Sequence, residues 1–315
     1  MSLSLAVVPA CKKPEEKDSK DAKDAKDGKD AKKGADDKKG ADDKKADDGG
    51  EEGTLAVADG DAAVEGPIPP DTSAVFFAVE GALYPLACFD KDKKKLLSGD
   101  ECMKMVKKDA DVRVASKFSS FNKKAGEPTE PQCMGGTGKK LAIAVEGITE
   151  GADFVYGTWP PSAIKIVTRS ADDTTSPPKT VLDQGPKDNL VAAIKSAGGS
   201  GEVTVDQVAE IDLDGDGKAE KVVSAHIPNP KIDETYDWSG LLIARGGDFG
   251  KLEVVEKLKN KPDVFELRGS FDLDGDKSAE LWVRRTSQDG SAGDTIFSGP
   301  GGKWKQVGGW SCGVE

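Results

Sequence analysis

Two short acidic segments hold the residues whose types and spacing are best suited to chemistry. The first reads Asp212-Leu-Asp-Gly-Asp-Gly-Lys-Ala-Glu220, and it returns sixty residues later as Asp272-Leu-Asp-Gly-Asp-Lys-Ser-Ala-Glu280. Four carboxylates within nine residues repel one another unless a cation neutralises them. Positions 1, 3, 5 and 9 offer carboxylates and position 7 a main-chain carbonyl, which are the hard oxygen ligands of calcium. The candidate ligands are Asp212, Asp214, Asp216, Lys218 and Glu220 in the first segment, and Asp272, Asp274, Asp276, Ser278 and Glu280 in the second.

The spacing separates these segments from an EF-hand, which places a bidentate Glu at position 12 and lies between two helices. Position 12 is Val223 in the first segment and Val283 in the second. The flanking residues 202–211 and 220–227 are rich in β-branched side chains with near-alternating polarity, which is typical of strands. We therefore expect each segment to be a calcium loop inside a β-hairpin.

This loop resembles the D-x-D-G-D-G-x-x-[DE] loop of the integrin-alpha FG-GAP and bacterial VCBS repeats. Both copies continue with an apolar run, a Gly-Gly turn and a Gly-Lys-apolar strand, within residues 241–255 and 295–307. The resemblance implies antiparallel β repeats of about four strands, similar to propeller blades. A closed propeller needs at least about four blades. Since two are visible, we expect a mainly β protein with a few short helices, whose repeats form an incomplete propeller or a twisted sheet.

The second loop departs from the family pattern at position 6, where Lys277 stands in place of Gly217. A non-Gly residue with positive φ costs on the order of 1 kcal/mol. The sequence therefore predicts two calcium sites, of which the second binds more weakly.

The N-terminal segment resembles the end of a bacterial lipoprotein signal. Residues 1–10 would be removed, Val8-Pro-Ala-Cys11 would be the lipobox, and Cys11 would carry the lipid. No Lys or Arg precedes Cys11, although a signal peptide normally begins with a basic region, so an ordinary apolar N-terminus is the alternative. Lys12 follows the cysteine, and by family analogy the absence of Asp there favours the outer membrane over the inner one.

Residues 11–70 are expected to form a disordered tether. From Lys12 to Glu52 nearly every residue is Lys, Asp, Glu, Ala or Gly, a composition that cannot bury enough apolar area to offset the entropy of ordering. A flexible coil of this length spans roughly 35 Å, enough to hold a domain clear of a membrane. The globular remainder divides into a β-rich part with short helices at 71–200 and two calcium-loop repeats at about 201–259 and 260–315.

Several elements are predicted in the first globular part. Residues 73–79 and 82–88 indicate a hairpin, and the capping-box spacing Ser98-Gly-Asp-Glu101 predicts a short helix that continues through 102–108. Further strands are expected at 139–148, 154–156 and 163–168. Residues 188–197 have the periodicity of a helix that buries Leu190, Val191 and Ile194.

Four cysteines besides Cys11 are most simply read as two disulfides in an exported chain. They are Cys88, Cys102, Cys133 and Cys312. Three pairings are possible. We favour a bond from Cys312 to the first half, since closing a long loop restricts the unfolded chain most.

Few residues in the sequence are candidates for a catalytic role. His226 is the single histidine, so a Ser-His-Asp or Cys-His arrangement would have to use it. The formal net charge of −12 argues against nucleic acid as a partner. These features predict a non-catalytic calcium-binding lipoprotein of a bacterial cell envelope, attached to the membrane through Cys11. A surface module that binds protein or carbohydrate is the first alternative, and a hydrolase with unrecognised carboxylates is the second.

Overall fold

The computed structural model describes residues 66–116, 119–129, 142–148, 154–166, 184–247 and 249–312. The signal segment, the lipidation of Cys11, nearly all of the tether and Cys133 lie outside the described residues. Everything described here belongs to one compact unit.

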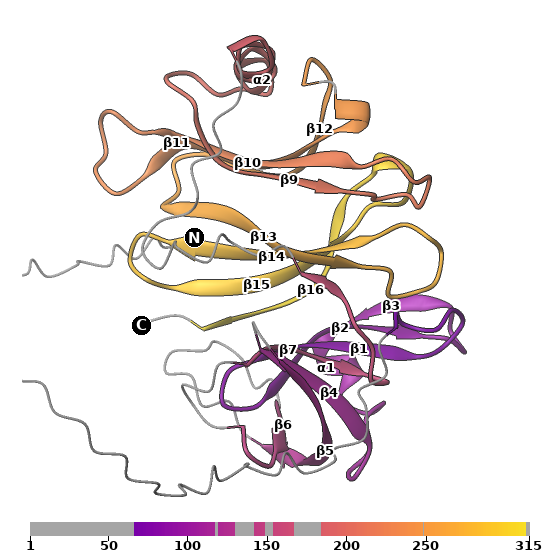
Figure 1. The fold of residues 1–315 in the computed structure, drawn as a ribbon. Helices are drawn as coiled ribbons and strands as arrows, with labels where there is room; N and C mark the ends of the chain where they lie inside the picture. Colours follow the sequence, from indigo (N-terminus) through magenta and orange to yellow (C-terminus); the bar gives the residue numbers. More distant parts are fainter. Residues whose placement is uncertain are drawn as a thin grey trace, which may run out of the picture. The chain divides into compact units, whose positions relative to one another are not determined.

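The first half forms a barrel-like sheet, at the bottom of Figure 1. Its strands are β1 (Ala74–Val79), β2 (Leu83–Asp90), β3 (Lys95–Ser98), β4 (Asp111–Ser116), β5 (Ser120–Thr129), β6 (Ala142–Val145) and β7 (Phe154–Trp159). The order is β1-β7-β4-β5-β6-β2-β3, and β1 also pairs with β2. Six strands therefore close on themselves, and β3 extends the sheet from β2. Closure removes the exposed edges that an open sheet of this size would carry.

The hairpin predicted at the start of this half is confirmed, because β1 and β2 pair antiparallel from Ala74 with Phe89 to Val79 with Leu83. The predicted helix at 102–108 is wrong. Helix α1 spans only Gly99–Cys102. Ser98 stands at its N-cap, but the Ser98 hydroxyl contacts the Glu101 carboxylate and makes no bond to a main-chain N–H. The capping bond that would support a longer helix is missing.

The second half consists of two four-stranded antiparallel units. The first unit contains β9 (Thr204–Ile211), β10 (Glu220–Pro228), β11 (Tyr236–Ala244) and β12 (Leu252–Leu258), and the second contains β13 (Asp263–Phe271), β14 (Glu280–Ser287), β15 (Ala292–Ser298) and β16 (Lys305–Cys312). The strand orders are β12-β11-β10-β9 and β16-β15-β14-β13, and the short strand β8 (Lys165–Ile166) adds to β13. Both sheets stay open, which agrees with repeats that do not form a closed propeller.

Apolar clusters join the three sheets in sequence. Leu241, Ile243, Leu267 and Val283 are among the side chains buried where the two repeat sheets pack together. Phe76 of β1 stacks on Phe271 of β13 with ring centroids 4.4 Å apart, within a cluster that joins the barrel to the second repeat. Burial of these large side chains supplies the main favourable free energy of packing.

Helix α2 (Gln184–Ser196) covers the other face of the first repeat sheet, as Figure 1 shows. Leu190 and Ile194 are fully buried there, as the periodicity predicts, whereas Val191 is only partly buried. Trp238 lies in the same cluster. No helix among the described residues has the length and apolar character needed to cross a membrane.

One disulfide is present among the described cysteines, between Cys88 of β2 and Cys102 of α1. The bond lies within the first half and closes a short loop. This bond excludes a pairing of Cys312 with Cys88 or Cys102. The remaining first-half partner expected for Cys312 is Cys133, which lies outside the described residues. The bond between Cys88 and Cys102 has a local cause. Strand β3 folds back on β2, with Cys88 opposite Leu97, and so brings α1 beside β2.

Candidate metal centre

The first acidic loop connects β9 to β10 and is held by its own carboxylates. Both oxygens of Asp212 accept main-chain hydrogen bonds, Oδ1 from Gly215 N–H at 2.8 Å and Oδ2 from Gly217 N–H at 3.0 Å. Asp214 accepts from the N–H of Asp216, and Asp216 accepts from that of Lys218. Glu220 reaches back from β10 to accept the Leu213 N–H at 2.9 Å. These five bonds fix the carboxylates before any ion arrives.

The second loop, between β13 and β14, repeats the same five hydrogen bonds. Asp272 accepts from the N–H groups of Gly275 and Lys277 at 2.8 and 2.9 Å, and Glu280 accepts from that of Leu273 at 2.7 Å. The remaining two bonds run from Asp276 N–H to Asp274 and from Ser278 N–H to Asp276. The two segments, which differ only at positions 6 and 7, thus adopt one loop geometry built on the same acidic residues.

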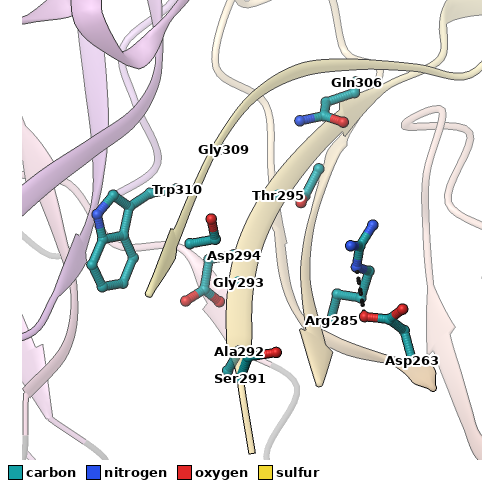
Figure 2. Close-up of a pocket in the computed structure, with 11 residues that line it drawn as sticks. Asp263, Arg285, Ser291, Ala292, Gly293, Asp294, Thr295, Gln306, Gly309 and Trp310 are labelled. Carbon is teal, nitrogen blue, oxygen red and sulfur yellow. Dashed lines mark ion pairs between the residues drawn. The ribbon is translucent and has the colours of Figure 1, made fainter. Parts of the chain in front are cut away.

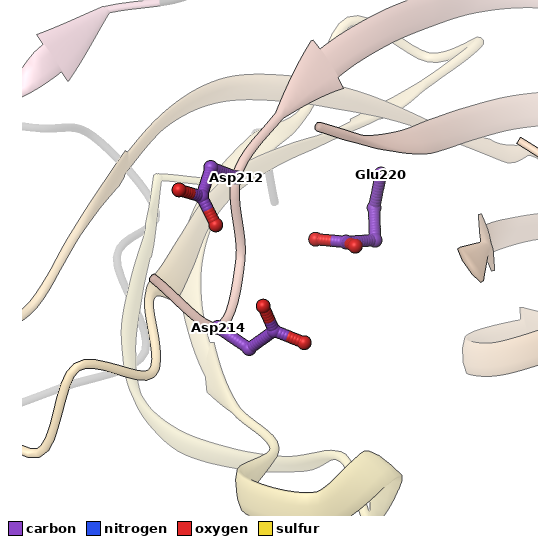
Figure 3. Close-up of side chains that lie close together, drawn as sticks. All are labelled: Asp212, Asp214 and Glu220. Carbon is purple, nitrogen blue, oxygen red and sulfur yellow. The ribbon is translucent and has the colours of Figure 1, made fainter. Parts of the chain in front are cut away.

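Carboxylate oxygens converge in both loops. Asp212, Asp214 and Glu220 each place one oxygen within 4.8 Å of the others (Figure 3), and so do Asp272, Asp274 and Asp276. Either group could hold a metal ion. Two sequence-predicted ligands, Asp216 in the first loop and Glu280 in the second, are not members of these converging groups. Asp216 instead lies 3.4 Å from the Lys218 ammonium, and its bond from the Lys218 N–H lowers the pKa of its carboxyl.

The backbone of both loops needs left-handed conformations. Gly215 and Gly275, at position 4, have φ of 71° and 76°. Position 6 also has positive φ, 86° at Gly217 and 72° at Lys277. Position 6 thus has positive φ in both loops, and Lys277 carries the associated strain in the folded state.

Burial makes the charges of the second loop costly without a cation. Desolvation raises the pKa of Glu280, which is 1% exposed, to about 8, against the opposing effect of its bond from Leu273 N–H. The negative charges of Asp274 and Asp272 add to the rise, and a hydrogen bond with the Ser298 hydroxyl opposes it. Burial and the neighbouring Asp276 also raise the pKa of Asp274 to about 6. A cation bound here would relieve both effects.

A nearby arginine distinguishes the first loop from the second. Arg245 follows β11 and places Nη1 3.2 Å from Asp214 Oδ2, while its Nε and Nη2 contact the two oxygens of Glu253. The bond to Glu253 raises the pKa of Arg245 further. Sequence reasoning missed this residue, because nothing in the spacing pairs Arg245 with an aspartate thirty-one positions earlier.

The donor set fits a hard divalent cation. Each group offers three carboxylate oxygens close enough to share one ion, and side-chain oxygen is the ligand type of calcium and magnesium. Zinc prefers nitrogen and sulfur ligands, and no histidine or cysteine belongs to either group. Position 7 of each loop, Lys218 or Ser278, donates its N–H to the preceding aspartate.

His226, the single histidine, lies away from both clusters. Its Nδ1 is 2.8 Å from Asp206 Oδ2, and its ring is 4.6 Å from that of Tyr236. His226 lies on strand β10, and its side chain is 16% exposed.

A cavity of about 340 Å³ opens on strands β13 to β16 (Figure 2). Its walls include Thr295, Gln306 and two aspartates. Asp263 pairs with Arg285 at 3.1 Å, and the buried Asp294 accepts from both Arg284 and the Trp282 indole. Both acids are thus tied to arginines.

Comparison with known proteins adds no assignment to this geometry. No protein-family model matches the chain, and comparisons with curated proteins and with solved structures likewise found no match.

Proposed function

We propose that this protein is a non-catalytic, calcium-binding component of a bacterial cell envelope, in which two calcium ions have a structural role. The observation that carries the proposal is the shared loop geometry. Five equivalent hydrogen bonds hold the acidic side chains in both loops, and three carboxylates converge within 4.8 Å in each. Such pre-orientation reduces the ordering cost of binding an ion.

Calcium suits these loops better than magnesium. Calcium accepts six to eight oxygen ligands at irregular angles, whereas magnesium demands near-ideal octahedral geometry and sheds water reluctantly. A nine-residue loop that offers carboxylates and main-chain carbonyls suits calcium, which accepts many oxygen ligands at irregular angles. The residues that would hold the ions are the two converging groups, with Asp216 and Glu280 close by in the same loops.

A structural role follows from where the loops lie. Leu213, at position 2 of the first loop, is buried between the two repeat sheets, and Leu273 is buried between the second repeat and the barrel. The N–H of each leucine donates to the glutamate at position 9. The Ala279 N–H of the second loop also donates to the Leu213 carbonyl. An ion that orders either loop therefore supports the packing of neighbouring sheets.

The envelope location rests on the sequence. The Val8-Pro-Ala-Cys11 segment and the Lys/Asp/Ala/Gly-rich tether support a lipid anchor on Cys11 and an outer-membrane position. The disulfide between Cys88 and Cys102 agrees with an oxidising compartment.

The cavity in Figure 2 favours a binding module as the second candidate function. Thr295 and Gln306 suit a polar ligand such as a carbohydrate. A hydrolase has less support, because an arginine neutralises each acid in the cavity and neither is placed as a free general base.

Thermal unfolding tests the calcium proposal. The protein is unfolded in chelator, then with calcium or with magnesium, as wild type, Asp214→Ala and Asp274→Ala. At a hundredfold excess over the dissociation constant each occupied site should add about 2.7 kcal/mol to the free energy of unfolding. Each variant should lose the contribution of one loop. Asp111→Ala, which removes an exposed carboxylate paired with Lys124 on the barrel, is the control. A midpoint indifferent to calcium would refute the proposal.

A further inference from the structure

We infer that Arg245 is a built-in counter-cation of the first loop, which makes that loop the weaker of the two calcium sites. The inference rests on the proposed calcium binding. It reverses the order expected from Lys277, for reasons of charge that the fold makes visible.

Arg245 is held rigidly beside the first cluster. Its Nη1 lies 3.2 Å from Asp214 Oδ2, an oxygen of one of the three converging carboxylates. The other edge of the guanidinium is fixed by two bonds to Glu253, at 2.7 and 3.3 Å. Glu253 in turn accepts from the Trp304 indole of the second repeat. Because this fork-to-carboxylate geometry orients the guanidinium, Arg245 has little freedom to withdraw when an ion enters.

The equivalent position in the second loop is neutral. Ala244 pairs with Lys221, the residue after Glu220, and Phe297 pairs with Leu281, the residue after Glu280. Arg245 and Ser298 therefore follow at matching places in the two repeats. Ser298 is buried and carries no charge.

A second difference in charge between the loops also disfavours a cation in the first loop. Position 7 is Lys218 in the first loop, and its ammonium lies 3.4 Å from Asp216 Oδ2. In the second loop position 7 is Ser278. Two cationic side chains thus contact carboxylates of the first loop. Arg245 contacts a member of the converging group, whereas Lys218 contacts Asp216 beside it, so Arg245 opposes an entering ion more directly. The second loop has neutral residues at both places.

The strain at Lys277 does not oppose binding in the same way. Lys277 already has φ of 72° and donates its N–H to Asp272, as Gly217 does to Asp212. The strained conformation is present before an ion binds. Its cost therefore falls on folding, whereas the repulsion from Arg245 falls on binding.

Coulomb repulsion sets the size of the effect. With the dielectric constant of bulk water, a divalent ion and a unit charge about 5–6 Å apart repel enough to weaken binding by about tenfold. Dissolved salt screens a partly exposed pair, so the difference should shrink as the ionic strength rises.

Calcium titration by calorimetry on single-loop proteins tests the inference. The double change Asp274→Asn with Asp276→Asn leaves the first loop to be measured, and Asp212→Asn with Asp214→Asn leaves the second. We expect the first loop to bind about tenfold more weakly. Adding Arg245→Gln to the first-loop protein should remove most of that gap, and Arg245→Lys, which keeps the charge, should preserve it. Lys108→Gln removes a charge from an exposed barrel pair and should change neither affinity.

Thermal unfolding in the absence of calcium is measured alongside the titration. In chelator, Arg245→Gln should lower the unfolding midpoint, because the first loop loses a cation that offsets its carboxylates. Equal affinities of the two loops, or an unchanged first-loop affinity in Arg245→Gln, would overturn the inference and leave calcium binding intact. Failure of both single-loop proteins to bind calcium would overturn the proposed function, and this inference with it.

Discussion

The buried carboxylate of Glu280 predicts that the metal-free protein loses stability as the pH rises. Burial raises its pKa from 4.5 to about 8 in the folded protein. In the unfolded chain the same group ionises near its ordinary value. For an acid with a raised folded pKa, the stability it contributes is fully present below pH 4.5 and is lost progressively up to about pH 8. The metal-free protein should therefore be more stable at pH 5 than at pH 8.5.

The size of the loss follows from the shift in pKa. At 1.36 kcal/mol for each unit, a rise from 4.5 to about 8 corresponds to at most about 5 kcal/mol. For a protein of this size, that loss lowers the unfolding midpoint by about 10–20 °C. Asp274, whose pKa is raised to about 6, adds a loss of the same sign at lower pH.

Thermal unfolding in chelator between pH 5 and 9 measures this dependence. Glu280→Gln should flatten the curve above pH 6, because the variant has no carboxylate to ionise. Glu127→Gln, which removes a charge from an exposed pair on the barrel, should leave the slope unchanged. Saturating calcium should also flatten the wild-type curve, since the ion favours the ionised carboxylates. Identical pH profiles for the wild type and Glu280→Gln would refute the reasoning.

Two further predictions concern the backbone. The double variant Cys88→Ser with Cys102→Ser should lose about 3 kcal/mol, because the disulfide closes a short loop; chemical unfolding measures the loss, and an unchanged denaturation midpoint would contradict it. Lys277→Gly should stabilise the metal-free protein by up to about 1 kcal/mol, since φ of 72° is unstrained for glycine. Gly217→Lys should destabilise it by a similar amount, and opposite signs for the two changes would contradict the strain argument.

Local features were readable from the sequence. The acidic spacing predicted both loops, and the β-branched flanks of the first loop predicted the strands β9 and β10 that carry it. The repeat extended the same expectation to β13 and β14. The apolar runs after each loop likewise predicted units of four strands. These features can be predicted from the sequence because a hairpin pairs residues that are close in the chain, so residue spacing and turn-forming residues are sufficient to define it.

Tertiary structure alone decided how the units meet. The barrel closes through pairing of β1 with β7, whose residues Val75 and Trp159 are far apart in sequence. The contact of Arg245 with Asp214 and the position of the neutral Ser298 beside Glu280 could not be predicted for the same reason, because these residues are also separated in sequence. Such contacts arise from the packing of whole sheets, and no periodicity along the chain encodes them.

The properties of the two acidic loops can be divided in the same way, between sequence and fold. Their sequences determine that each loop folds around its own carboxylates, because the loop hydrogen bonds are made within nine residues. The electrostatic difference between the loops is a property of the fold. It depends on how deeply Glu280 is buried, and on whether Arg245 after β11 or Ser298 at the end of β15 lies beside the loop. Burial and charge proximity act through space, so only the tertiary structure could decide them.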